Sequence, residues 1–180
     1  MSTLAPGARI SVLYDAETLD RRVHELASEI VSDMGREPLV IPVLKSSFIF
    51  AADLLRALHE AGAEPDVDFV SLSSYGQGTL SLGEVKIVRD TEVEIAGRDV
   101  LIIDDILESG RTLAYAKDLM TARRARLVKT CVLLDKPGKL AVPMKADFTG
   151  FQCPDKFVIG YGMDVAHAYR QLPFVGVMEG

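Results

Sequence analysis

Two helical patterns separated by an apolar strand make up the first third of the chain. Apolar residues recur at intervals of three and four from Leu19 to Met34, and Gly35 follows as a natural C-terminal stop. Pro38 to Leu44 is apolar and β-branched, which is typical of a buried strand. A second helical pattern runs from Phe48 to Leu58 and is closed by Gly62. This order predicts parallel strands joined by helices.

The middle of the chain continues the alternation. Apolar runs predict three more strands, and one helical pattern lies between the last two: 67–72, 100–103 and 126–134 for the strands, with the helix starting at about Arg111. The polar stretch Ser73–Gly83 predicts a mobile loop, although a plain hairpin tip explains its composition too. Residues 85–89 and 92–95 are expected to form a short ribbon beside it.

The last segments are short, aromatic and interrupted by turns. From Pro143 onward no long helical period appears, so 143–180 predicts a small hood beside the sheet, together with the N-terminal strand region. Neither an internal repeat nor a low-complexity segment is found. We therefore expect one α/β domain over 1–180, with a mostly parallel central sheet flanked by helices.

The segment DVLIIDDILESGRT, residues 99–112, carries the clearest chemical signal. Its apolar run ends at Asp104 and Asp105, so both carboxylates are expected at the carboxyl end of a strand, where α/β sheets bind ligands. Ser109 and Gly110 predict a tight turn into a helix whose first amides suit a phosphate. The pattern predicts a site for a sugar phosphate and a divalent metal. An acidic loop before an ordinary helix cap is the plainer alternative.

Composition narrows the class of protein. The chain has 180 residues, 48% of them hydrophobic, which suits one sizeable core. No window approaches the ~18 apolar residues of a membrane span, and the N-terminus does not resemble a leader, so we expect no membrane association and a cytosolic protein. Cys131 and Cys153 are expected to be buried thiols rather than a disulfide or a zinc site. The net charge of −6 argues against nucleic-acid binding, despite a basic cluster near Arg123–Arg126.

The motif IIDDILESGRT resembles that of the type I phosphoribosyltransferases, which consists of four apolar residues, two acidic residues and a phosphate loop. The segments VLKSSFIF (43–50), SLSSYG (71–76) and ADFTGFQCPDKFVIGYGMD (146–164) narrow the resemblance to the hypoxanthine-guanine phosphoribosyltransferases. It implies the type I fold with its hood. It also implies transfer of a phosphoribosyl group from phosphoribosyl pyrophosphate to hypoxanthine or guanine, with Mg2+ as cofactor, giving IMP or GMP. Family members are homodimers or homotetramers.

The resemblance also implies a role for individual residues. Leu44, Lys45, Ser46 and Arg170 would bind pyrophosphate; Asp104 and Asp105 would bind the ribose and a metal ion, and Asp164 a second metal ion. The loop residues Glu108, Ser109, Gly110, Arg111 and Thr112 would bind the 5′-phosphate, and Lys136, Phe157 and Val158 the base. Ser74 and Tyr75 would begin a mobile lid of about 73–84 that closes over the substrates. Outside the resemblance, Lys45, Lys136 and Arg170 would be read as surface or turn residues, Asp164 as a turn former, and Phe157 as a core residue.

Three of these positions depart from the family pattern. Ser46 replaces a glycine in a tripeptide that is often cis in the family, and the sequence leaves that conformation open. Asp104 replaces a glutamate. Glu108 stands where the family has the aspartate that accepts a proton from purine N7. One more methylene moves the carboxylate by roughly 1.5 Å, and an error of about 1 Å can cost a hundredfold in rate. We expect Glu108 to serve as the base after local adjustment.

Three rival interpretations remain at this stage. Xanthine-guanine and pyrimidine phosphoribosyltransferases share the phosphate machinery and differ in the hood. An RNA-binding regulator on the same fold, like the pyrimidine attenuation regulators, would need a basic face that a pI of about 5.1 hardly offers. A receiver domain would have its acidic pair near the start of the chain rather than at the middle.

Overall fold

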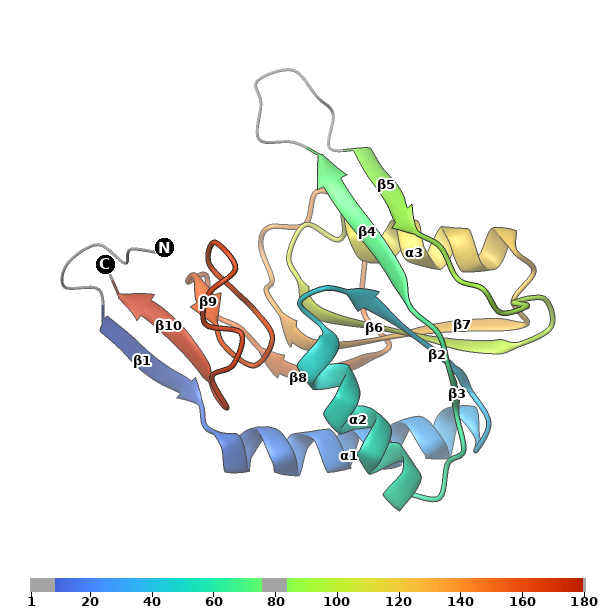
Figure 1. Ribbon diagram of the computed structural model, residues 1–180, viewed down its shortest axis with the longest axis horizontal. Coiled ribbons are helices and arrows are strands. Elements are labelled where there is room, and N and C mark those ends of the chain that lie inside the picture. The colour runs from blue at the N-terminus through green and yellow to red at the C-terminus, as the bar shows by residue number, and fades with distance from the viewer. Residues whose placement is uncertain (1–8, 76–83, 180) are drawn as a thin grey trace.

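The protein forms two sheets, a large one covered by helices on both faces and a small one beside it (Figure 1). A computed structural model describes residues 9–75 and 84–179. The large sheet has the strand order β5-β4-β2-β6-β7-β8, with β3 paired to β2. All its pairings are parallel except that of β4 with β5. The prediction of an α/β fold with a mostly parallel central sheet is confirmed.

The elements follow the apolar pattern of the sequence. In the large sheet the strands are β2 (Leu39–Leu44), β3 (Asp66–Val67), β4 (Val70–Tyr75), β5 (Glu84–Arg89), β6 (Asp99–Leu107), β7 (Leu127–Asp135) and β8 (Phe148–Gln152). The helices are α1 (Ala16–Met34), α2 (Phe48–Glu60) and α3 (Arg111–Ala122). Asp15 caps α1 by accepting the amide of Thr18 at 2.8 Å. No helix in the described ranges is long and apolar enough to cross a bilayer.

The core has two halves, one on each face of the large sheet. On β6, Leu101 and Ile103 pack with α1 and α2, whereas Val100 and Ile102 pack with α3. Successive strand residues point to opposite faces, so a strand covered on both sides must be apolar throughout. This explains the unbroken apolar run before the two aspartates. Cys131 and Cys153 are free and buried, as predicted.

The small sheet unites the two ends of the described chain. Its strands are β1 (Arg9–Tyr14), β10 (Val175–Glu179) and β9 (Val158–Ile159), in the order β1-β10-β9. We use the term hood for this sheet and the loop 160–173 that follows β9. Within the stretch expected to form mainly hood, β8 instead joins the large sheet, parallel to β7.

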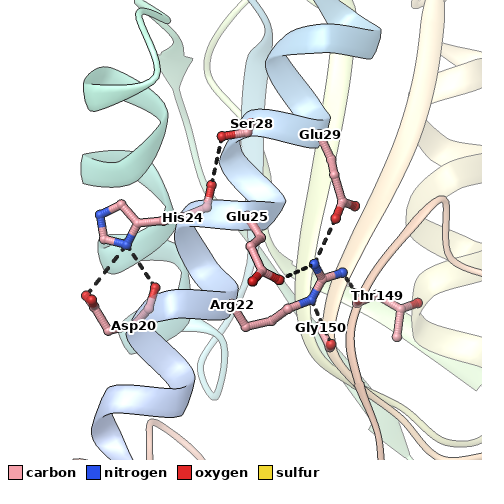
Figure 2. Close-up of polar contacts among 8 residues, drawn as sticks. All are labelled: Asp20, Arg22, His24, Glu25, Ser28, Glu29, Thr149 and Gly150. Carbon is pink, nitrogen blue, oxygen red and sulfur yellow. Dashed lines mark hydrogen bonds and ion pairs between the residues drawn. The ribbon is translucent and has the colours of Figure 1, made fainter.

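Arg22 of α1 fastens the edge strand β8 to the body of the protein. Its guanidinium donates to the carbonyl oxygens of Gly150 at 2.9 Å and Thr149 at 2.8 Å, and it pairs with Glu25 and Glu29 (Figure 2). Unpaired backbone groups on an edge strand are open to association with other chains. By donating to two carbonyl oxygens of β8, Arg22 leaves fewer unpaired backbone groups on this edge strand.

Two details of the sequence analysis are corrected by the structure. Residues Glu92–Ile95 do not form a strand, because the carboxylate of Asp68 accepts the amides of Glu92 and Val93 at 2.6 and 3.1 Å and takes them from any ladder. The partner of β5 is β4. The motif strand, in turn, does not stop at Ile103: β7 pairs alongside it as far as Leu107, so Asp104 and Asp105 lie within β6.

Candidate active site

Asp104 and Asp105 lie on β6 just past the point where one neighbouring strand stops pairing. β2 pairs with β6 only as far as Ile103, so beyond it the sheet opens on one side. Asp104 is buried and Asp105 is half-buried, and the Asp105 amide donates to Oδ1 of Asp104 at 3.0 Å. Both residues line a cavity of about 550 Å3, which we call the phosphate cavity.

The electrostatics of this pair favour a cation. Burial, and then the charge of Asp105, raise the pKa of Asp104 well above its ordinary value. Burial also raises the pKa of Asp105. No group of three metal-ligating side chains exists among the described residues. Mg2+, however, is often held by one or two carboxylates together with substrate phosphates. The donor set therefore fits a magnesium ion that arrives with a phosphorylated substrate.

The loop after β6 and the start of α3 line the same cavity. Gly110 has φ +77°, and a Cβ added to it would lie 3.0 Å from Cβ of Met144 and 3.1 Å from the carbonyl oxygen of Val142. Only glycine fits this turn without displacing neighbours. The N-cap residue of α3, Gly110, has no side chain to cap the helix, and Oγ of Ser109 lies 3.4 Å from the amide of Arg111, the first residue of α3. The first amides of a helix lack partners within the helix, so this end of α3 suits an anion.

The segment after β2 forms the opposite wall. Leu44, Lys45 and Ser46 line the phosphate cavity, and the Leu44–Lys45 peptide is cis, which answers the question that the sequence left open. Lys45 is exposed, whereas Ser47 is fully buried and donates from Oγ to the carbonyl oxygen of Val43 at 2.6 Å. This hydrogen bond anchors the turn that leads into α2.

A cluster in the hood approaches the same wall. Arg170 donates to the carbonyl oxygen of Gly162 at 2.7 Å, contacts Oγ of Ser46 at 3.4 Å, and pairs with Asp164 at 2.8 Å. Gly162 has φ +101°, and a Cβ there would meet the carbonyl oxygen of Ser46 at 2.2 Å. The hood loop therefore packs directly against the start of α2, with backbone against backbone.

A second cavity of about 410 Å3 adjoins the first, and we call it the base cavity. The two share Ser46, Asp105, Glu108 and Lys139 among their lining residues. Lys136, Val158 and Asp164 also line the base cavity. Phe157 lines it too and is 55% exposed, so it is not the core residue that an apolar strand would otherwise suggest. An exposed aromatic side chain on a cavity wall offers a flat surface for a planar ligand.

Glu108 and Lys136 meet where the two cavities join. Nζ of Lys136 lies 3.0 Å from Oε1 of Glu108, and Lys136 is only 5% exposed. The amide of Lys136 donates to the carbonyl oxygen of Leu107 at 2.9 Å, which fixes its backbone to β6. A hydrogen-bond acceptor and a cationic donor thus stand side by side at the entrance to the base cavity.

The structure brings nearly all of the predicted site residues to these two cavities. Arg111 opens α3 next to them, and Arg170 reaches them through Ser46 and Asp164. For Ser74 and Tyr75 only the backbone, at the end of β4, is described, and the expected lid at 76–83 lies outside the described residues. Sequence reasoning missed Lys139 and Asp155, which also line the base cavity. Lys139 lies three residues after Lys136, and Asp155 lies within the segment 146–164, but neither composition nor spacing distinguishes them there.

Comparison with known proteins identifies the family. A family model described as the phosphoribosyl transferase domain matches residues 10–166. The hypoxanthine-guanine phosphoribosyltransferase of Bacillus subtilis is 44% identical over 169 residues, which cover 93% of this chain and 92% of that protein. The hypoxanthine-guanine phosphoribosyltransferase of Aquifex aeolicus is 43% identical over 175 residues, which cover 96% of this chain and 97% of that protein.

Further relatives extend this result. The bifunctional protein TilS/HprT of Listeria innocua is 46% identical over 93% of this chain, but the chain spans only 26% of its length. A crystal structure of a hypoxanthine-guanine phosphoribosyltransferase from Bacillus anthracis is similar with a TM-score of 0.86 and 40% identity, covering 96% of this chain and 100% of that one. The receiver-domain alternative is therefore excluded. With its aspartate pair, its phosphate loop and these relatives, the chain belongs to the phosphoribosyltransferase family, among the hypoxanthine-guanine phosphoribosyltransferases.

Proposed function

We propose that the protein transfers the 5-phosphoribosyl group from phosphoribosyl pyrophosphate to hypoxanthine or guanine. The products are IMP or GMP and pyrophosphate, so the reaction salvages purines. The observation that carries this proposal is the Glu108–Lys136 pair, 3.0 Å apart, between a cavity for phosphates and a cavity with an exposed aromatic wall.

The pair matches one edge of a 6-oxopurine. Such a base presents an oxygen acceptor, O6, next to a ring N–H at N7. Lys136 donates to O6 and Glu108 accepts the proton of N7 while the ring forms its bond to C1′ of the ribose and the bond from C1′ to pyrophosphate breaks. Adenine presents an amino group to the lysine, which is donor against donor, so the site disfavours it. Phe157 stacks on the ring, and the backbone of Val158 faces the base edge.

The phosphate cavity holds the other substrate. The loop Glu108–Thr112 receives the 5′-phosphate through its amides and through the hydroxyls of Ser109 and Thr112. Asp104 and Asp105 face the ribose hydroxyls. Across the cavity, Lys45 and Ser46 take pyrophosphate, and Arg170 offers a guanidinium fork for phosphate oxygens. These contacts hold ribose and leaving group in line for the transfer.

Magnesium is proposed as the cofactor of this reaction. Asp104 and Asp105 would hold one ion with the substrate, and Asp164 would help to hold a second on pyrophosphate. When bound, the metal neutralises the charge of the departing pyrophosphate. Asp164 has other partners in the free protein, since it pairs with Arg170 at 2.8 Å and accepts the amide of His167 at 2.7 Å.

The last two residues of β4 are proposed to begin a lid. Ser74 and Tyr75 would start a loop that closes over both substrates and excludes water from the ribosyl cation.

We further propose a cytosolic enzyme that assembles as a homodimer or homotetramer. The family resemblance supports this, and sedimentation of the protein at micromolar concentration tests it.

The experiment that tests the function is pyrophosphate release from phosphoribosyl pyrophosphate and Mg2+. It uses hypoxanthine, guanine, xanthine, adenine and uracil in separate reactions. Turnover with the first two bases is expected. Activity with xanthine or uracil alone would favour a phosphoribosyltransferase of other base specificity. Absence of turnover with all five bases, together with salt-sensitive RNA binding, would favour the regulator.

A further inference from the structure

Four charged side chains form a closed network at the entrance to the base cavity. Oε1 of Glu108 lies 3.0 Å from Nζ of Lys136 and 3.6 Å from Nζ of Lys139. Oδ1 of Asp155 lies 2.6 Å from Nζ of Lys139 and 3.7 Å from Nζ of Lys136. Each lysine therefore faces both carboxylates, and the formal charges of the four cancel.

The members of this network differ sharply in exposure. The side chain of Lys136 is 6% exposed, whereas those of Lys139 and Asp155 are 46% and 62% exposed. A buried ammonium without a counter-charge is strongly disfavoured, so Lys136 needs a carboxylate at all times. The exposed pair has no such need. Its members are nevertheless closely joined, and this contact raises the pKa of Lys139 and lowers that of Asp155.

The proposed reaction takes Glu108 away from Lys136. A base that donates N7–H to Glu108 and accepts from Lys136 at O6 comes between the two groups. Glu108 becomes neutral when it takes the proton. Within this network, the Lys136 ammonium is then balanced by the oxo group of the base and by the carboxylate of Asp155. Lys139 cannot balance it, because Lys139 is itself a cation.

We propose that Asp155 is a positioning residue that holds the Lys136 ammonium against the oxo group of the base while Glu108 is engaged with the proton. Lys139 holds Asp155 in turn through their 2.6 Å ion pair. The inference rests on the proposed function and deepens it. It makes the preference for 6-oxopurines depend on two carboxylates, of which the second, Asp155, acts through Lys136.

The experiment compares Asp155→Asn, Asp155→Glu and wild type in steady state with hypoxanthine and with adenine. In Asp155→Asn we expect the KM for hypoxanthine to rise about tenfold and the preference for hypoxanthine over adenine in kcat/KM to fall by a similar factor. The KM for phosphoribosyl pyrophosphate should stay within about twofold, since the phosphate contacts are untouched. Asp155→Glu keeps the charge and should recover most of the selectivity.

Two controls make the result specific. Asp118→Asn removes the same charge from an exposed position on α3 and should behave as wild type. Lys139→Met should change selectivity in the same direction as Asp155→Asn, but less. Unchanged selectivity in Asp155→Asn, or an equal rise in KM for both substrates, would overturn the inference while leaving the function intact. A wild-type protein that turns over no base would overturn the proposed function itself, and this inference with it.

Discussion

The proposed reaction depends on Glu108, whose side chain is one methylene longer than the aspartate of the family pattern. It stands where the resemblance expects an aspartate, yet its Oε1 reaches the Lys136 ammonium at 3.0 Å. The extra methylene is thus accommodated with the carboxylate at the mouth of the base cavity. The role of base assigned to Glu108 can be tested by removing its charge without changing its size.

Glu108→Gln is expected to lower kcat for hypoxanthine by about 10²- to 10⁴-fold, the usual contribution of a positioned proton acceptor. The KM for phosphoribosyl pyrophosphate should change little, because the proposed phosphate contact of Glu108 is its backbone amide, which the substitution keeps. Glu108→Asp, the matched control, restores the residue type of the family and should retain most of the activity. Steady-state kinetics of the three proteins provide the check. Full activity in the Gln variant would mean that the proton acceptor is another group.

The raised pKa of Asp104 makes the stability of the free protein depend on pH. The folded state binds this proton more tightly than the unfolded chain, where the ordinary value is 3.8. The free energy of unfolding therefore falls as the pH rises from about 4 through the raised pKa. Asp104→Asn removes this loss, because an amide stays neutral at every pH.

We expect Asp104→Asn without substrate to melt about 2–4 °C above wild type at pH 8, the shift that ~1 kcal/mol gives in a domain of this size. The difference should shrink as the pH is lowered toward 5. Thermal melts at several pH values measure it, with Asp118→Asn as the control for a lost surface charge. A variant that melts at or below the wild-type temperature at pH 8 would refute the account of this pair.

At the scale of elements, the site depends on how closely the hood loop packs against the start of α2. A methyl group on Gly162 would overlap the Ser46 carbonyl, which is backbone and cannot turn aside. Gly162→Ala should therefore displace Ser46 and the neighbouring Lys45, the proposed pyrophosphate contacts. The KM for phosphoribosyl pyrophosphate should then rise at least about tenfold, as misplacements near 1 Å do. Isothermal titration with pyrophosphate and Mg2+ measures the same loss directly.

Gly62→Ala is the matched control for that variant. Gly62 also has a positive φ, +89°, but an added Cβ there meets nothing within 4 Å. It should lower stability by about 1–2 kcal/mol through backbone strain and leave the KM unchanged. Equal KM values in the two variants would show that the close packing at Gly162 is not required for binding.

The junction between α1 and β8 concerns stability rather than chemistry (Figure 2). Arg22→Ala removes two charged hydrogen bonds to the edge strand and should lower the free energy of unfolding by about 1–3 kcal/mol. Arg21→Ala changes an exposed neighbour on the same helix and should have little effect. Urea denaturation compares the two. If both variants lost the same stability, the contacts of Arg22 with β8 would contribute nothing measurable.

The sequence predicts elements best where one physical pattern dominates. The periodicity of α1 and α2, and the apolar runs of β2 and β7, locate those elements within a few residues. The sequence does not predict which sheet β8 joins, because a short aromatic strand has the same composition in a hood as at a sheet edge. The apparent strand at Glu92–Ile95 fails because a distant side chain, Asp68, takes two of its amides. Such long-range hydrogen bonds leave no local pattern.

The same limit applies to the site. The Asp104–Asp105 pair and the phosphate loop are contiguous in sequence, so the motif predicts their shared cavity. Lys136 and Glu108 are 28 residues apart in the sequence. Only the family resemblance predicts that both lie at the base. Lys139 and Asp155 had no such guide. Their place in the network follows from the packing of the turn after β7 against the segment after β8.

At the scale of the whole molecule, the two substrates of the proposed reaction would meet between the large sheet and the hood. The phosphate cavity belongs mainly to the sheet and the base cavity draws on both parts. The basic cluster near Arg123, which an RNA-binding protein would expose, is largely neutralised here. Arg123 pairs with Asp90 at 2.6 Å and Arg126 with Asp99 at 2.5 Å. Together with a net charge of −6, this favours small phosphorylated substrates over a nucleic-acid partner.

The most direct test of this account is the conversion of hypoxanthine to IMP by the wild-type protein. Phosphoribosyl pyrophosphate, Mg2+ and hypoxanthine are supplied, and the nucleotide product is identified by mass. We predict one IMP formed for each pyrophosphate released, a comparable result with guanine, and no product when Mg2+ is chelated. Pyrophosphate release without IMP, or equal turnover of adenine, would contradict the claim that Glu108 and Lys136 select and deprotonate a 6-oxopurine.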